Sequence, residues 1–93
     1  MGEKIELSCQ KTGAMHVHSL DSISSMMWRP PYEFQEDKFA EFLKTDIAPL
    51  CIVFCDFASC EIFVERSTAK SVLKIFYSHM EDRTFKADNE EGE

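Results

Sequence analysis

Apolar and polar side chains alternate along the stretch Ala14–Leu20, whose sequence is Ala-Met-His-Val-His-Ser-Leu. Met15 and Val17 fall on one side of this stretch. His16 and His18 fall on the other side. Because successive side chains of a strand point to opposite faces, this pattern predicts a half-buried strand.

Two later stretches carry apolar residues at the spacing of amphipathic helices. The first covers about Gln35–Thr45, and Pro49 lies shortly after its end. The second covers Ser67–Met80 and begins with a residue type that caps helix N-termini. The helix residues that we expect to be buried are Phe39, Phe42, Leu43, Val72, Leu73 and Phe76.

Three more stretches are predicted to be strands. Leu50–Cys55 is a short, continuous apolar run that is rich in strand-forming residues. In Cys60–Glu65, one side carries Cys60, Ile62 and Val64 and the other carries Glu61, Phe63 and Glu65, and Arg83–Ala87 is interpreted as a short final strand. Between the first strand and the first helix, the irregular apolar stretch Asp21–Tyr32 is interpreted as a long connection.

The predicted order is strand, helix, strand, strand, helix, strand. This is the ferredoxin-like split βαβ arrangement (βαββαβ) of the α+β class, with a four-stranded antiparallel sheet and two helices on one face. We expect residues 14–87 to form this domain. Residues 1–13 are an N-terminal extension that could hold a short extra strand, and residues 88–93 are an acidic disordered tail or the start of a linker.

Two of these strands resemble the sequence motifs of the RNA-recognition motif (RRM) family. Met15–Leu20 resembles the hexamer on the first strand of that family, and Ser59–Arg66 resembles the octamer on its third strand. The residues after the octamer resemble the second helix of the family, so that the likeness covers about Ala14–Ala87. The resemblance implies an open sheet face on which aromatic side chains stack RNA bases.

The positions that would bind RNA depart from the family pattern. The three base-stacking positions hold His16, Glu61 and Phe63, and only the last is a full aromatic platform. Ser59 stands where the family has a basic residue that reaches a phosphate. The resemblance therefore implies a degenerate RNA-binding face, with residual contacts from His16, His18 and Phe63.

The charge of the chain also disfavours RNA. Seventeen acidic and ten basic side chains give a formal net charge of −7. A negative surface repels the phosphate backbone, which supplies most of the affinity for nucleic acids. We therefore expect any binding of RNA to be weak.

Large apolar residues in the connection before the first helix indicate a different kind of binding. Met26, Met27, Trp28 and Tyr32 are of types that are enriched at the centres of protein interfaces. Ile75 lies off the apolar stripe of the second helix and should be exposed. These residues either cover the edge of a small core or form a docking surface for another protein, which could be a second copy or a second RRM-like domain.

Candidate chemistry is sparse. His16 and His18 have the spacing of a metal-binding pair, but no Cys-x-x-Cys completes such a site, and we expect no metal, no cofactor and reduced cysteines. No glycine-rich loop or other catalytic motif is present, so an enzyme is not expected. With no signal peptide or membrane span, we expect a soluble intracellular protein, cytoplasmic or nuclear, that does not bind membranes.

Two hypotheses on function follow from the sequence. In the first, the chain is an RRM-like module for protein–protein interaction, through dimerisation or scaffolding, within a ribonucleoprotein assembly. In the second, it binds single-stranded RNA weakly through Phe63 and His16.

Overall fold

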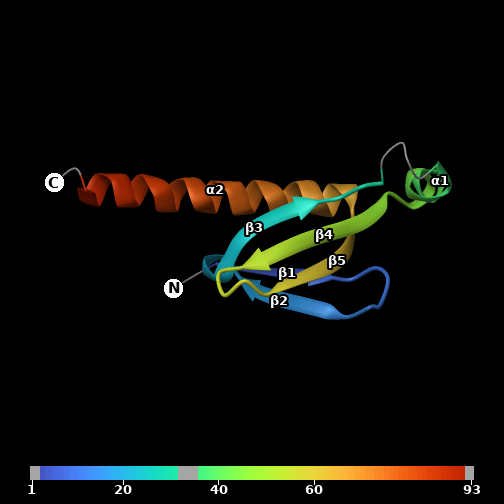
Figure 1. Ribbon diagram of the computed structural model, residues 1–93, viewed down its shortest axis with the longest axis horizontal. Helices are drawn as coiled ribbons and strands as arrows, with labels where there is room; N and C mark the ends of the chain where they lie inside the picture. Colours follow the sequence, from blue (N-terminus) through green and yellow to red (C-terminus); the bar gives the residue numbers. More distant parts are fainter. Residues whose placement is uncertain (1–2, 32–35, 92–93) are drawn as a thin grey trace.

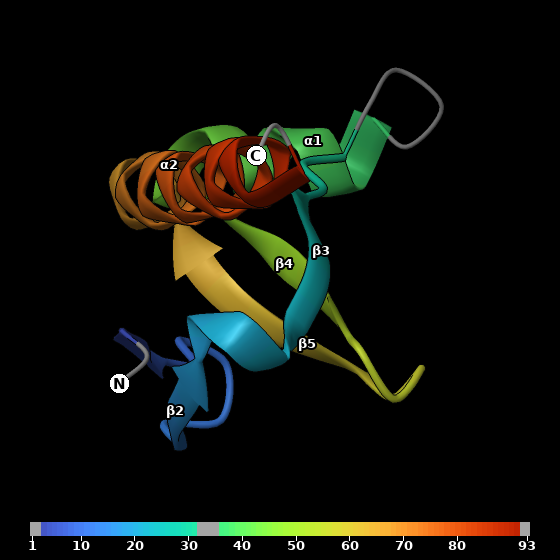
Figure 2. The same ribbon diagram turned by 90° about the vertical axis from the view of Figure 1, so that its left-hand side faces the viewer.

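The computed structural model describes residues 3–31 and 36–91, and it describes the side chains of these residues up to residue 82. Over these residues the chain forms five strands, two α-helices and a 3-10 turn at Leu20–Ser22. The strands divide into two separate antiparallel sheets, and one long helix lies over the larger sheet (Figures 1 and 2). The protein therefore belongs to the α+β class.

The smaller sheet is a hairpin of β1 (Lys4–Ser8) and β2 (Met15–Ser19). Gly13 permits the chain reversal, because its φ of 77° lies in the left-handed region that other residues rarely adopt. The Cys9 N–H donates to the Ala14 carbonyl (2.8 Å), and the Gly13 N–H donates to the Cys9 carbonyl (2.7 Å). The short extra strand that the sequence allowed within residues 1–13 is β1.

The larger sheet has the strand order β3-β4-β5, with β3 at Ile23–Trp28, β4 at Ile47–Phe54 and β5 at Ser59–Glu65. Neighbouring strands are antiparallel, and the register pairs Leu50 with Ile62. One face of this sheet carries much of the core. Its buried apolar residues are Ile23, Met26, Ala48, Leu50, Ile52, Ile62 and Val64.

The hairpin and the long helix complete the core around this face. Ile5 and Leu7 of β1 belong to the same buried cluster, and the Gln10 N–H donates to the Phe63 carbonyl of β5 (2.7 Å). The helix α2 (Arg66–Glu91) packs its first half on the cluster through Ala69, Val72 and Phe76. Its second half continues past the strands, at the opposite end of the molecule from α1 (Glu36–Thr45) (Figure 1).

The predicted βαββαβ order with one four-stranded sheet is wrong. The elements follow each other as β1-β2-β3-α1-β4-β5-α2, and the sheets have two and three strands. The two helices do not share one sheet face, because α1 lies at the end of the strands while α2 lies along them (Figure 1). The described residues therefore do not form the open four-stranded face that an RRM uses for RNA.

The first source of the error is β3, which lies inside the predicted connection Asp21–Tyr32. The pairing of β3 with β4 shifts its register between Ile23 and Ser25. Because of this irregularity, the buried residues Ile23 and Met26 are three positions apart instead of two or four. The alternation that identifies a strand in the sequence is lost for this reason.

The second source is the segment Arg83–Ala87, which is helical and not a strand. No Gly or Pro occurs between Arg66 and Glu91, so no residue of the sequence breaks the helix before that point. The predicted disordered tail, residues 88–93, begins with residues that form the last turn of α2, and residues 92 and 93 lie outside the described part.

The burial predicted for α1 is also partly wrong. Phe42 is buried, with 4% of its surface exposed, but Phe39 is 39% exposed and Leu43 is 63% exposed. Because α1 lies at the end of the sheet instead of on its face, only one side chain of its apolar stripe is buried. The predicted residues of α2 are buried or half-buried, namely Val72, Leu73 and Phe76.

This packing predicts a large difference between two neighbouring substitutions on α1. Phe42→Ala removes its only buried side chain and should lower the free energy of unfolding by about 3 kcal/mol. Leu43→Ala changes an exposed side chain and should lower it by less than about 0.5 kcal/mol. Urea unfolding followed by circular dichroism measures both values, and equal losses would contradict the described position of α1.

Candidate functional site

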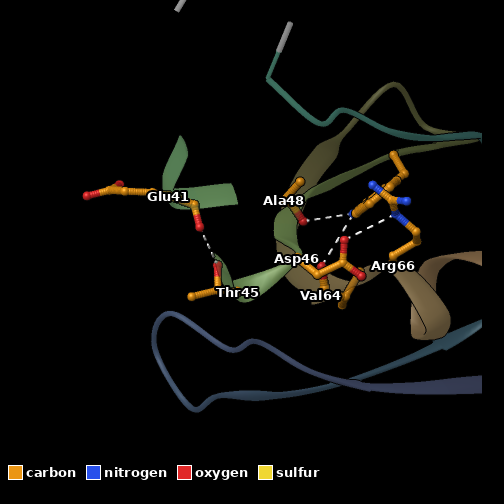
Figure 3. A network of polar contacts seen from close by, with 7 residues as sticks. Glu41, Thr45, Asp46, Ala48, Val64 and Arg66 are labelled. Atoms are coloured by element: carbon orange, nitrogen blue, oxygen red, sulfur yellow. Dashed lines mark hydrogen bonds and ion pairs between the residues drawn. The ribbon is translucent and has the colours of Figure 1, made fainter. Parts of the chain in front are cut away.

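A polar junction joins the end of α1 to the start of α2 (Figure 3). Asp46 follows α1 with a φ of 61°, and its N–H donates to the Phe42 carbonyl at the end of the helix. The Asp46 carbonyl accepts a hydrogen bond from the Arg66 N–H (3.0 Å), and its carboxylate lies 3.1 Å from the Arg66 Nε. Since both side chains are more than 40% exposed, this ion pair contributes little to stability and mainly positions the guanidinium.

Trp28, the last residue of β3, lies against this junction and is half-buried. Its indole N–H donates to the Ala48 carbonyl of β4 (3.1 Å) and lies 3.4 Å from the Val64 carbonyl of β5. Its ring centroid is 5.6 Å from that of Phe42. The Arg66 guanidinium lies over both rings, 5.9 Å from the Trp28 centroid and 5.4 Å from the Phe42 centroid. Trp28 therefore connects α1 with all three strands of the larger sheet.

A groove of about 1070 Å³ opens beside Trp28 and Phe42. Its walls come from the β1–β2 turn, the end of β3, α1, the start of β4 and the middle of β5. The large apolar residues that line it are Met27, Trp28, Phe42, Ile47, Pro49 and Phe63. Charged side chains stand at its edges, and the ammonium group of Lys11 lies 4.8 Å from the ring centroid of Phe63.

Three exposed apolar side chains extend the apolar surface at this end of the molecule. Met27, which lines the groove, is 58% exposed. On α1, Phe39 and Leu43 are four residues apart and so lie on the same side of the helix. Phe39 also stacks on Phe42, with ring centroids 6.1 Å apart. Met27, Phe39 and Leu43 are three of the eight large apolar side chains that are exposed among the described residues, and the other five lie on β2, in the β4–β5 turn and on α2.

The residues that the sequence suggested for a protein interface do not all lie on one surface. Met27 and Trp28 line the groove, but Met26 is 4% exposed and belongs to the core. Ile75 is 44% exposed on α2 and does not line the groove. Tyr32 lies outside the described residues.

Sequence reasoning missed most of the charged groove residues. Arg29 directly follows Trp28, so its position next to the predicted interface residues was a usable signal. Lys11 lies in the β1–β2 turn and Lys38 in the first turn of α1, and each is at least ten positions from the predicted site residues Met27, Trp28 and Phe63. Only the tertiary structure brings them to one place.

His16 and His18 lie on the core side of the hairpin, where they pair with the buried residues Leu7 and Ile5. The alternation within β2 is as predicted, but its exposed side carries the two apolar residues, Met15 (64%) and Val17 (50%). Phe63 lies in the groove, where His16 does not reach. The structure thus does not unite the three residues that the RRM resemblance suggested for RNA.

His18 has the less favourable environment of the two histidines. Its ring centroid lies 4.9 Å from that of Phe54, and its Nε2 is buried with no hydrogen-bond partner among the described residues. Burial lowers the pKa of His18 below its usual value of 6.5, and the nearby His16 lowers it further. The folded protein therefore favours the neutral ring.

The described residues do not form a site with evident catalytic or metal chemistry. Among them, no three His, Cys, Asp or Glu side chains are placed to hold a metal ion. The hydrogen bond with the Thr12 side chain is the main cause that lowers the pKa of Cys9 to about 7, but this thiol is only 3% exposed and so cannot reach a substrate. Within residues 3–31 and 36–91, no helix has both the length and the apolar character that are needed to cross a membrane.

Comparison with known proteins does not add a function to this geometry. No family model matches the chain, and neither a curated protein nor a solved structure matches it. The likeness of Met15–Leu20 and Ser59–Arg66 to RRM motifs therefore stays a prediction from the sequence. The case for a functional site rests on the groove and its surroundings.

The environment of His18 predicts that acid destabilises the fold. The pKa is lower in the folded protein than in the unfolded chain, so the unfolded chain takes up the proton first as the pH falls below about 6.5. The free energy of unfolding should therefore decrease between pH 7.5 and pH 5.5, and His18→Gln should make this decrease smaller. Urea unfolding at a series of pH values provides the test, and His16→Gln, which removes only the smaller cause of the lowered pKa of His18, should reduce the decrease by less. An unchanged pH dependence in His18→Gln would refute the assignment.

Proposed function

We propose that this chain is a protein-interaction module that binds a segment of another protein in the groove beside α1. The observation that carries the proposal is the groove itself, whose apolar lining includes the exposed side chain of Met27 and the ring of Phe42, on which the exposed Phe39 stacks. Apolar groups that gather on one part of a surface are typical of interaction sites. Tryptophan, methionine and arginine, which all contribute here, are enriched at the centres of protein interfaces.

The exposed helix face beside the groove favours a peptide segment over a small molecule. Pockets for small molecules enclose about 300–1,000 Å³ and bury most of the ligand. This groove has about 1070 Å³ and is bordered by an exposed helix face. A partner segment that fills the groove could also cover Phe39 and Leu43, which a small ligand in the groove would leave exposed.

The wall formed by Trp28 and Phe42 favours binding without rearrangement. The indole is held by the hydrogen bond to the Ala48 carbonyl and by the guanidinium of Arg66. Side chains that are already ordered lose little conformational entropy when a partner binds. We therefore expect the groove to be present in the free protein.

Weak binding of single-stranded RNA is the second candidate function, because Phe63 and the cation of Lys11 lie in the same groove. Three observations make it the less favoured one. The Lys11 ammonium already occupies a position over the ring of Phe63, His16 lies on the core side of the hairpin, and the chain has a net charge of −7. A base would have to displace Lys11 before it could stack there.

Selection from a random dodecamer peptide library displayed on phage, with the whole chain immobilised, tests the proposal. The strongest peptide is synthesised with a fluorescent label, and its affinity is measured by anisotropy. Met27→Glu introduces a charge in the groove and should weaken binding by about tenfold, or about 1.4 kcal/mol. The matched control is Ile75→Glu on α2, which should leave the affinity within about twofold.

Three outcomes would contradict the proposal. They are a failure to select any peptide, equal losses in the two variants, and a loss confined to Ile75→Glu. Tighter binding of a labelled oligouridine dodecamer than of the selected peptide, lost on Phe63→Ala, would instead support RNA binding.

A further inference from the structure

The charge around the groove has the opposite sign to the charge of the whole chain. Three basic residues, Lys11, Arg29 and Lys38, line the groove, and Glu41 is its only acidic lining residue among those that the structure describes. The chain as a whole has 17 acidic and 10 basic side chains. The groove therefore combines an apolar floor with a local excess of positive charge on an acidic protein.

These three cations come from separate parts of the fold, namely the β1–β2 turn, the end of β3 and the first turn of α1. All three residues are exposed, and none of them forms an ion pair with another described residue. Arg66 differs from them, because it pairs with Asp46. The cations at the groove thus remain available for carboxylates of a binding partner.

We propose that the segment which binds in this groove is an acidic peptide with an aromatic or large aliphatic anchor, supplied by a partner protein. This inference rests on the proposed function and specifies the chemistry of the partner. The anchor lies on the apolar floor beside Met27 and Pro49, so that Lys11 stays over the ring of Phe63. Aspartate or glutamate residues on either side of it pair with Lys11, Arg29 and Lys38.

The energies of these pairs set what the experiment can detect. A single exposed ion pair changes the affinity by about fivefold at most, so that one lysine alone gives only a small effect. Three pairs across one groove act together, and they favour acidic partners over basic ones because a basic segment would be repelled. Since the groups are exposed, salt screens them, and the affinity should fall as the ionic strength rises.

The same peptide selection tests this inference when the acidic and basic residues of the selected sequences are counted. We expect peptides with an excess of Asp and Glu around an aromatic or leucine residue. The matched variants are a groove triple, Lys11→Glu with Arg29→Glu and Lys38→Glu, and a control triple that reverses three exposed lysines outside the groove. The control substitutions are Lys4→Glu, Lys70→Glu and Lys74→Glu.

The affinity of the strongest selected peptide should fall by about thirtyfold or more in the groove triple and by about threefold or less in the control triple. Because both triples change the net charge equally, the difference isolates the position of the charges. The chain has one tryptophan, so a change in its fluorescence on binding reports contact near Trp28. A tenfold rise in salt concentration should also weaken binding to the unchanged chain about tenfold, and this measurement does not depend on whether a triple variant folds.

Several results would overturn the inference. If neutral or basic peptides bind and change the Trp28 fluorescence, the acidic partner is wrong while the proposed function stands. Equal losses of affinity in the two triple variants, or an affinity that does not depend on salt, would also refute the acidic partner and leave the proposed function standing. If a synthetic peptide of residues 82–93 binds as tightly as the best selected peptide, the occupant is a second copy of this chain instead of a partner protein. If no peptide changes the fluorescence of Trp28, both proposals fail.

Discussion

The indole of Trp28 holds together the end of the molecule at which the groove forms. A tryptophan has one N–H donor, and here it points between the carbonyls of Ala48 and Val64 on the two neighbouring strands. The indole ring also contacts Phe42, near the end of α1, and the guanidinium of Arg66, the first residue of α2. A smaller apolar residue could fill part of this volume but could not make the hydrogen bond. The floor of the groove and the position of α1 both depend on this side chain.

This arrangement explains why Phe39 and Leu43 of α1 stay exposed. The core lies between α2, the larger sheet and the hairpin, and α1 stands outside it. Because Phe42 is the buried side chain of α1, the other large side chains of its apolar stripe, Phe39 and Leu43, stay exposed. Exposed Phe39 and Leu43 contribute little to the stability of the free chain. Their burial against a partner segment would gain free energy from the hydrophobic effect, which is why this end of the molecule is the best candidate for binding.

The sequence predicted those parts of the fold in which local patterns and burial agree. The strand at β2, the buried run within β4, the alternation of β5 and the starts of both helices were all visible in the spacing of apolar residues. The register shift near Ile23 concealed β3, and Pro49, which normally argues against a central strand, concealed the first part of β4. The inward position of His16 and His18 could not be seen either, because the side of a strand that faces the core depends on its packing. Of the residues that line the groove, the sequence singled out only Met27, Trp28 and Phe63, since the other walls come from distant segments that meet only in the folded chain.

The central claim is that the wall of the groove is already assembled in the free protein around Trp28. The chain contains one tryptophan, so labelling this residue with nitrogen-15 gives one indole N–H signal in an NMR spectrum. Hydrogen–deuterium exchange of this proton, measured on the chain without any partner, tests the claim directly. The account predicts exchange many times slower than in an unstructured tryptophan peptide, together with nuclear Overhauser effects between the indole and the ring of Phe42. Exchange at the rate of the peptide, with no contact to Phe42, would contradict it.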